Sequence, residues 1–141
     1  MVQLIVGKKG KGKTKYLLDK VNTAIQDAHG SIVYLDKSSK HMYELNNKIR
    51  LIDVSAFPLR NSDEFIGFIC GILSQDHDLE QMYLDSFLRL ARLEGRENEI
   101  DGCVKQLEEI SRIFGADFVL SVSLDKEELS AELQEKIILA L

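Results

Sequence analysis

The chain carries one motif with a clear chemical meaning, a glycine- and lysine-rich octet close to its start. The octet consists of Gly7, Lys8, Lys9, Gly10, Lys11, Gly12, Lys13 and Thr14, and it fits the pattern G-x-x-x-x-G-K-[ST] of phosphate-binding loops. Glycines let such a loop point successive backbone N–H groups at a phosphate. The helix that follows adds the positive end of its macrodipole. We expect Lys13 to contact the β- and γ-phosphates of a nucleoside triphosphate and Thr14 to ligate Mg²⁺.

Further lysines surround this motif. Lys8, Lys9, Lys11 and Lys15 make it the one strongly basic segment of a chain whose formal net charge is −5. Because Lys13 alone would satisfy the motif, we interpret the additional charge as a local field that favours polyanions. The alternative is a solvated loop.

A magnesium site of this kind needs a second anchor, usually an aspartate at the end of a buried strand. Three predicted strands end in such a residue, namely Asp36, Asp53 and Asp85. We favour Asp85, because it follows the fourth strand and would open toward the same edge of a parallel sheet as the octet. Asp36 is the second candidate. For each aspartate the alternative is a capping role at a turn or helix.

The elements that must position these residues alternate between strands and helices. Short apolar runs predict buried strands, and apolar residues at helical spacing predict amphipathic helices. The expected strands are 3–6, 31–35, 49–54, 79–84 and 117–122, and the expected helices are 13–28, 62–73, 99–114 and 126–138, with a short helical turn at 41–47. An added edge strand is the alternative for residues 137–141. We expect Gly30 to end the first helix in the left-handed conformation and Ser62 to cap the second.

This alternation predicts a single α/β domain over residues 1–141, a three-layer fold in which helices cover both faces of a parallel sheet of about five strands. At 141 residues the chain is long enough to bury a core without disulfides. We interpret Tyr34 and Tyr83, inside two of the strands, as core residues.

Composition excludes several classes of protein. Cys70 and Cys103 lie on separate apolar helical patterns, which indicates buried thiols in a reducing compartment. The longest uncharged apolar run, residues 65–73, is far shorter than the ~20 residues of a membrane span, and no signal peptide is evident. We therefore expect a cytoplasmic protein without membrane insertion. The acidic balance argues against nucleic acid as a partner.

The residues named so far resemble a known family, the P-loop NTPases with a RecA-like core. Residues 7–14 match that family's Walker A motif, residues 83–86 are similar to its Walker B strand, and residues 118–123 are placed like its sensor strand, with Ser121 and Ser123 as the polar residues. Small bacterial chains of this kind are labelled twitching-motility-type ATPases, although the acidic and histidine boxes of that group are not found here. The resemblance spans residues 2–125. It implies ATP and Mg²⁺ as ligands and an all-parallel sheet in the order third, second, fourth, fifth, first strand.

One departure from the family concerns hydrolysis. RecA-like ATPases typically carry a catalytic glutamate just after the second strand or directly after the Walker B aspartate, and the matching residues here are Ser38 and Ser86. We therefore expect slow or partner-dependent hydrolysis, with Glu44 and Glu80 as the carboxylates to examine first if turnover proves fast.

Three arginines after the fourth strand, Arg89, Arg92 and Arg96, either form a solvated face or supply a transition-state arginine to a neighbouring subunit or protein partner.

No Asn/Thr-Lys-x-Asp motif for reading guanine is present, which favours ATP over GTP. Two other functions remain open. One is a non-catalytic nucleotide-sensing switch or scaffold. The other is a small-molecule or nucleotide kinase, for whose lid and acceptor segments the chain has little room.

Overall fold

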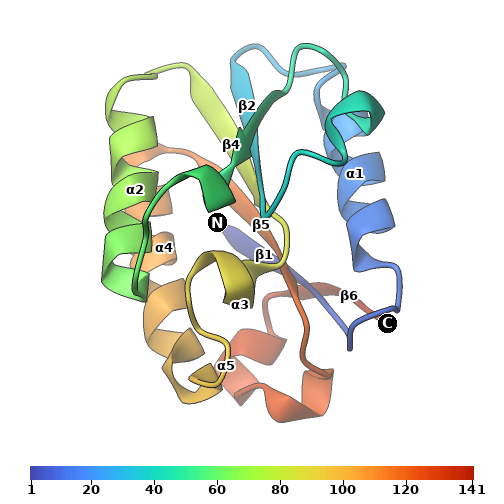
Figure 1. Ribbon diagram of the computed structural model, residues 1–141, viewed down its shortest axis with the longest axis vertical. Helices are drawn as coiled ribbons and strands as arrows, with labels where there is room; N and C mark the ends of the chain where they lie inside the picture. Colours follow the sequence, from blue (N-terminus) through green and yellow to red (C-terminus); the bar gives the residue numbers. More distant parts are fainter.

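The apolar runs of the chain pair side by side into one sheet in the computed structural model, which describes residues 1–141. The strands are β1 (Val2–Val6), β2 (Ser31–Asp36), β3 (Arg50–Asp53), β4 (Leu79–Leu84), β5 (Asp117–Val122) and β6 (Ile137–Ala140), in the order β3-β2-β4-β5-β1-β6 (Figure 1). Every neighbouring pair is parallel. The predicted order of the first five strands is thus confirmed, and a sixth strand extends the sheet beyond β1.

Helices pack against both faces of this sheet (Figure 1). The helices are α1 (Lys13–Ala24), α2 (Ser62–Ser74), α3 (Phe87–Leu90), α4 (Ile100–Phe114) and α5 (Ala131–Gln134). A cluster of 10 buried residues joins α1 to one face, and a larger cluster of 31 buried residues joins α2, α4 and α5 to the other. The chain is therefore an α/β fold in three layers. No helix is long and apolar enough to cross a membrane.

The best-defined sequence pattern, that of α4, shows why these helices form where they do. Its buried positions include Ile100, Cys103, Val104, Leu107 and Ile110, which recur at helical spacing, while polar residues such as Lys105, Gln106 and Glu109 are exposed. The other cysteine, Cys70, is half-buried against the same core. Burial raises the pKa of the Cys103 thiol to about 12, so this thiol stays protonated at neutral pH.

The end of the chain differs from the predicted helix over 126–138. A 3-10 turn (Lys126–Glu128) and the short α5 occupy the first part, and β6 occupies the last. Leu129 and Leu133 are drawn into the main core, while the backbone of β6 pairs with β1. The pairing closes with the Leu141 N–H donating to the Val6 carbonyl at 2.9 Å. An edge strand at 137–141 was the alternative, and it is the one found. It covers the outer edge of β1, which would otherwise expose unpaired backbone groups.

Two predicted helix boundaries are wrong. Helix α1 ends at Ala24, and Gly30 is not among the glycines with positive φ. Gly30 instead allows a close approach, because a Cβ there would lie 1.9 Å from the carbonyl oxygen of Asp78. Helix α2 is capped by Asn61 rather than Ser62, with the Asn61 side chain accepting from the Glu64 N–H at 2.9 Å. Both errors are local, and neither changes the sheet.

The close approach at Gly30 predicts the result of a matched pair of glycine substitutions. Gly30→Ala forces a methyl group into the Asp78 carbonyl and should lower the free energy of unfolding by about 1–3 kcal/mol. Gly71→Ala, inside α2 with no neighbour within 4 Å of the added Cβ, should raise it by roughly 0.5–1 kcal/mol. Urea denaturation of both variants checks this. Equal effects at the two sites would contradict the packing at Gly30.

Candidate functional site

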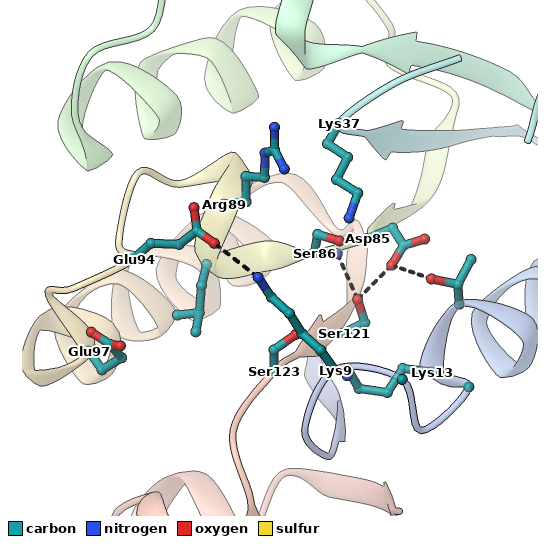
Figure 2. A pocket seen from close by; sticks show the side chains of 14 residues that line it. Lys9, Lys13, Lys37, Asp85, Ser86, Arg89, Glu94, Glu97, Ser121 and Ser123 are labelled. Atoms are coloured by element: carbon teal, nitrogen blue, oxygen red, sulfur yellow. Dashed lines mark hydrogen bonds and ion pairs between the residues drawn. The ribbon is translucent and has the colours of Figure 1, made fainter. Parts of the chain in front are cut away.

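A cavity of about 600 Å³ opens at the carboxyl ends of the central strands. Its lining comes from the loops after β1, β2, β4 and β5, and only one of the 14 lining residues is hydrophobic. They are Lys9, Gly10, Gly12, Lys13, Thr14, Lys37, Asp85, Ser86, Leu88, Arg89, Glu94, Glu97, Ser121 and Ser123 (Figure 2). In open parallel sheets this edge is where ligands bind. The polar lining favours a charged ligand over an apolar one.

The glycine-rich octet forms the loop between β1 and α1. Gly10 and Gly12 adopt φ values of +84° and +90°, in the left-handed region that side chains disfavour. An added Cβ would meet nothing within 4 Å at either position, so backbone conformation rather than crowding requires these glycines. Helix α1 begins directly afterwards at Lys13. The loop thus ends at a helix N-terminus, an arrangement with affinity for anions.

Lys13 is buried, although it carries a charge. Its Nζ donates to the Lys8 carbonyl at 3.1 Å, inside the same loop. Burial lowers the pKa of Lys13 from its ordinary value, and the nearby Asp85 carboxylate acts in the opposite direction. The side chain is therefore held in place by the loop without a carboxylate in ion-pair contact, and an added anion would stabilise its charged form.

Asp85 is the centre of the site's hydrogen bonds. It is 2 % exposed, and its Oδ1 accepts from the hydroxyls of Thr14 at 3.2 Å and Ser121 at 2.7 Å (Figure 2). Its Oδ2 accepts from the Tyr34 hydroxyl at 2.9 Å. The Ser121 oxygen also accepts from the Ser86 N–H at 2.7 Å. Three hydroxyls from β2, β5 and α1 thus fix one buried carboxylate.

Sheet register explains why these groups meet. Leu35 pairs with Leu84, and Leu84 pairs with Leu120, so the next residue of each strand, Asp36, Asp85 and Ser121, falls in one row. Side chains alternate along a strand, so this row lies on the same face as Tyr34, two residues before Asp36. That face is the one covered by α1, which brings Thr14 to Asp85.

Tyr34 was predicted to be a core residue, and it is fully buried. Its hydrogen bond to Asp85 was not foreseen. Burial, together with the Asp85 charge, raises the pKa of the Tyr34 hydroxyl above its usual range, so it remains a donor. The signal available in the sequence was its place two residues before a strand-end aspartate, on the same face of the sheet.

The two other strand-end aspartates differ from each other. Asp36 is 1 % exposed, and its Oδ1 accepts from the Lys37 N–H at 2.7 Å while its Oδ2 has no partner. Burial and the Asp85 charge raise the pKa of Asp36. Asp53 has the capping role that was the alternative, accepting from the Ser55 N–H at 3.0 Å. Asp36 is therefore an orphaned buried acceptor beside Asp85.

The lysines in and near the octet differ in their partners. Lys8 pairs with Glu128 at 2.7 Å and Lys9 pairs with Glu94 at 3.8 Å. Lys11 and Lys15 are exposed and do not line the cavity. A further lysine that the sequence analysis did not single out, Lys37, follows β2, and Figure 2 shows its side chain pointing toward Asp85 and Ser86.

The remaining candidates lie in different places. Arg89 lines the cavity, as does Ser123, whereas Arg96 pairs with Glu99 at 3.9 Å. Glu80 accepts from the Gly30 N–H at the opposite end of the sheet, and Glu44 contacts His41. Neither glutamate lines the cavity, so neither is a candidate base here; the cavity glutamates are Glu94 and Glu97.

Comparison with known proteins adds no identification. No protein-family model matches the chain, and no curated protein matches it. The structure also contains no group of three or more His, Cys, Asp or Glu side chains arranged to hold a metal ion. The evidence for function is therefore the geometry of the cavity itself.

The orphaned Asp36 carboxylate predicts a gain in stability on its removal. Asp36→Asn should raise the free energy of unfolding at pH 7 by roughly 1–3 kcal/mol, because a buried acceptor without a partner loses its charge. A carboxyl whose pKa is raised by folding stabilises the fold fully below its unfolded pKa of about 4, and this contribution is lost as pH rises through the folded pKa. The gain should therefore shrink toward pH 4.

Thermal or urea unfolding between pH 4 and pH 7 measures this difference. Asp53→Asn is the matched control, because that carboxylate already accepts from Ser55 and should show no gain. A loss of stability at pH 7 in Asp36→Asn would contradict the account.

Proposed function

We propose that this chain is a P-loop nucleotide-binding protein of the RecA-like type, which binds Mg-ATP and hydrolyses it slowly or only with a partner. One observation carries the proposal: the hydroxyl of Thr14, in a G-x-x-x-x-G-K-[ST] loop, donates to the buried strand-end carboxylate of Asp85 at 3.2 Å. A loop that cradles phosphates and an aspartate that anchors magnesium meet in this way in such proteins. Composition alone would not bring these two groups together.

Phosphate binding is supported by the charge balance of the cavity. Gly10, Gly12 and the start of α1 offer backbone N–H groups, and Lys13 lies buried with only the Lys8 carbonyl as its partner. A triphosphate would supply the missing negative charge. The absence of a guanine-reading motif favours ATP over GTP.

Magnesium fits the residues present. Thr14 and Asp85 would hold the ion, directly or through its waters, and the unpartnered Oδ2 of Asp36 offers a further acceptor for such a water. When bound, Mg²⁺ neutralises charge on the phosphate oxygens. The chain's own part is to hold the Asp85 carboxylate in one orientation, which the hydroxyls of Thr14, Tyr34 and Ser121 do.

The cavity has fewer features that would support ATP hydrolysis than features that would support ATP binding. Ser86 lines the cavity and is not a base, and the residue after Asp36 is Lys37, a cation. No carboxylate follows β2 or Asp85 at the positions where RecA-like ATPases carry their glutamate. An arginine supplied in trans is worth 10³–10⁵ in rate in related systems, so a second copy or another protein is the expected activator.

A nucleotide-sensing switch is the second candidate, and two ion pairs favour it. Lys8 binds Glu128 at 2.7 Å and Lys9 binds Glu94 at 3.8 Å, which ties the loop to the segments after β5 and α3. A bound polyphosphate competes with both glutamates for these lysines. Nucleotide binding would thereby release two surface segments and report the ligand to a partner.

The proposal also includes a cytoplasmic location, which the two free cysteines, Cys70 and Cys103, are compatible with. The net charge of −5 argues against nucleic acid as a partner.

Lys13 gives the direct test of nucleotide binding. Lys13→Ala should weaken Mg-ATP binding at least about tenfold, because a charge-assisted contact to phosphate is worth about 1.5–3 kcal/mol. Isothermal titration with ATP, GTP and ADP measures it. Lys15→Ala, next to the motif but outside the cavity, is the matched control and should bind like the parent chain. Unchanged affinity in Lys13→Ala with an unchanged melting curve would refute the proposal.

Asp85 and the missing glutamate give a test of catalysis. The purified chain should release phosphate from ATP far below the ~10 s⁻¹ median for enzymes. Asp85→Asn should weaken the dependence of ATP binding on Mg²⁺, whereas Asp53→Asn should leave it unchanged. Phosphate release and magnesium titrations measure both. Fast turnover by the chain alone would show that a catalytic carboxylate acts in the cavity, with Glu94 and Glu97 the first to replace.

A further inference from the structure

A second pocket of about 440 Å³ adjoins the cavity. It lies further along the carboxyl edge of the sheet, between the turn after β3 and the segment that begins at α3. Its lining consists of Lys37, Val54, Ser55, Arg89, Leu90, Arg92 and Glu94, of which Lys37, Arg89 and Glu94 also line the first cavity. The two spaces are therefore neighbours that share a cationic wall.

The charge of this pocket is unbalanced. Lys37, Arg89 and Arg92 face it with only one carboxylate, that of Glu94, and Glu94 is directed toward Lys9 at 3.8 Å (Figure 2). Figure 2 also shows the Arg89 guanidinium pointing away from Glu94, toward the side on which Lys37 lies. In a chain of net charge −5, an excess of cations in one hollow is unexpected from composition.

The arginines of this pocket differ from the other arginines of the chain, which are paired with carboxylates. Four of the six arginines contact a carboxylate within 4 Å, namely Arg50, Arg60, Arg96 and Arg112. The two that do not are Arg89 and Arg92, and both line the second pocket. Arg92 donates to the carbonyls of Leu59 at 2.9 Å and Arg89 at 2.8 Å, which hold its guanidinium in place without neutralising it.

We propose that this second pocket binds the anionic group, a phosphate or carboxylate, of a small-molecule co-ligand. Arginine offers planar, bidentate donors that match both oxyanions. Its position relative to the nucleotide rests on the proposed function. Across the sheet the order β1, β5, β4, β2, β3 runs from the glycine-rich loop through Ser121 and Asp85 to Lys37 and Ser55, so the co-ligand would lie beyond the terminal phosphate.

Lys37 and Arg89 then have a shared role, because they line both spaces. They would contact the terminal phosphate from one side and the co-ligand anion from the other. The shared cations would thereby lie between two anions that otherwise repel each other, which lets both ligands be bound at once.

Backbone amide spectra of the full chain, labelled with ¹⁵N, test the proposal. Inorganic phosphate, and citrate as the carboxylate probe, are titrated with the first cavity saturated by Mg²⁺ and a non-hydrolysable ATP analogue. We expect the amides of Ser55 and Leu90 to shift under these conditions with at least one probe. The probe that binds more tightly shows whether the pocket prefers a phosphate or a carboxylate.

Ser55→Glu supplies the discriminating variant, because Ser55 lines only the second pocket and is exposed. Added negative charge there should weaken binding of the probe about tenfold or more, while the response of the Gly12 and Thr14 amides to the analogue stays the same. Ser55→Gln is the matched neutral control and should bind the probe like the parent chain. Both variants lose the Ser55 hydroxyl bond to Asp53 at 2.6 Å, so that loss cancels in the comparison.

Three results would overturn the inference: no shift at Ser55 and Leu90, equal probe affinity in the Glu and Gln variants, or displacement of the probe by the ATP analogue. The last would mean that the pocket only extends the nucleotide cavity. Failure of the proposed function looks different. In that case the Gly12 and Thr14 amides do not respond to the analogue, while the probe still binds at Ser55 and the co-ligand site stands.

Discussion

A single buried carboxylate organises the carboxyl edge of this sheet. Asp85 accepts hydrogen bonds from three hydroxyls, one each from β2, β5 and α1. An ionised carboxylate at 2 % exposure is costly unless such donors surround it. The strands and the helix must therefore reach the edge in a fixed register. Moving any one of them by one residue would turn Tyr34, Thr14 or Ser121 away and leave the charge without partners.

Charge is distributed unevenly around that carboxylate. Four of the six arginines of the chain pair with a glutamate or aspartate, whereas Lys13, Lys37 and Arg89 line the site without an ion pair. Electrostatic repulsion among them is a cost that folding tolerates here. Binding sites for charged ligands commonly contain such unpaired like charges, because the bound ligand offsets their repulsion.

Several parts of this arrangement were predictable from the sequence, and others depended on contacts between distant segments. The octet and Asp85 follow from motif spacing and from alternating strands and helices, and the order of the first five strands was implied by the family resemblance. Tyr34 and Lys37 were not predictable as site residues, because only the pairing of β2 with β4 places them beside Asp85. Gly30 resembled a helix terminator, and its actual neighbour, Asp78, is 48 residues away along the chain. The prediction of a helix over 126–138 was wrong because burial of Leu129 and Leu133 and the pairing of β6 with β1 outweighed the local helical preference.

The position of β1 has a consequence for how the chain folds. β1 is the first strand in the sequence, yet it pairs only with the last two, with Val2 opposite Phe118 and Leu4 opposite Ile137. Bringing residues so far apart in the sequence together costs conformational entropy. Such long-range contacts therefore slow folding and form late. Strands β2, β3, β4 and β5 can assemble from nearer neighbours. During synthesis on the ribosome, the glycine-rich loop would therefore acquire its shape only after nearly all of these residues have emerged.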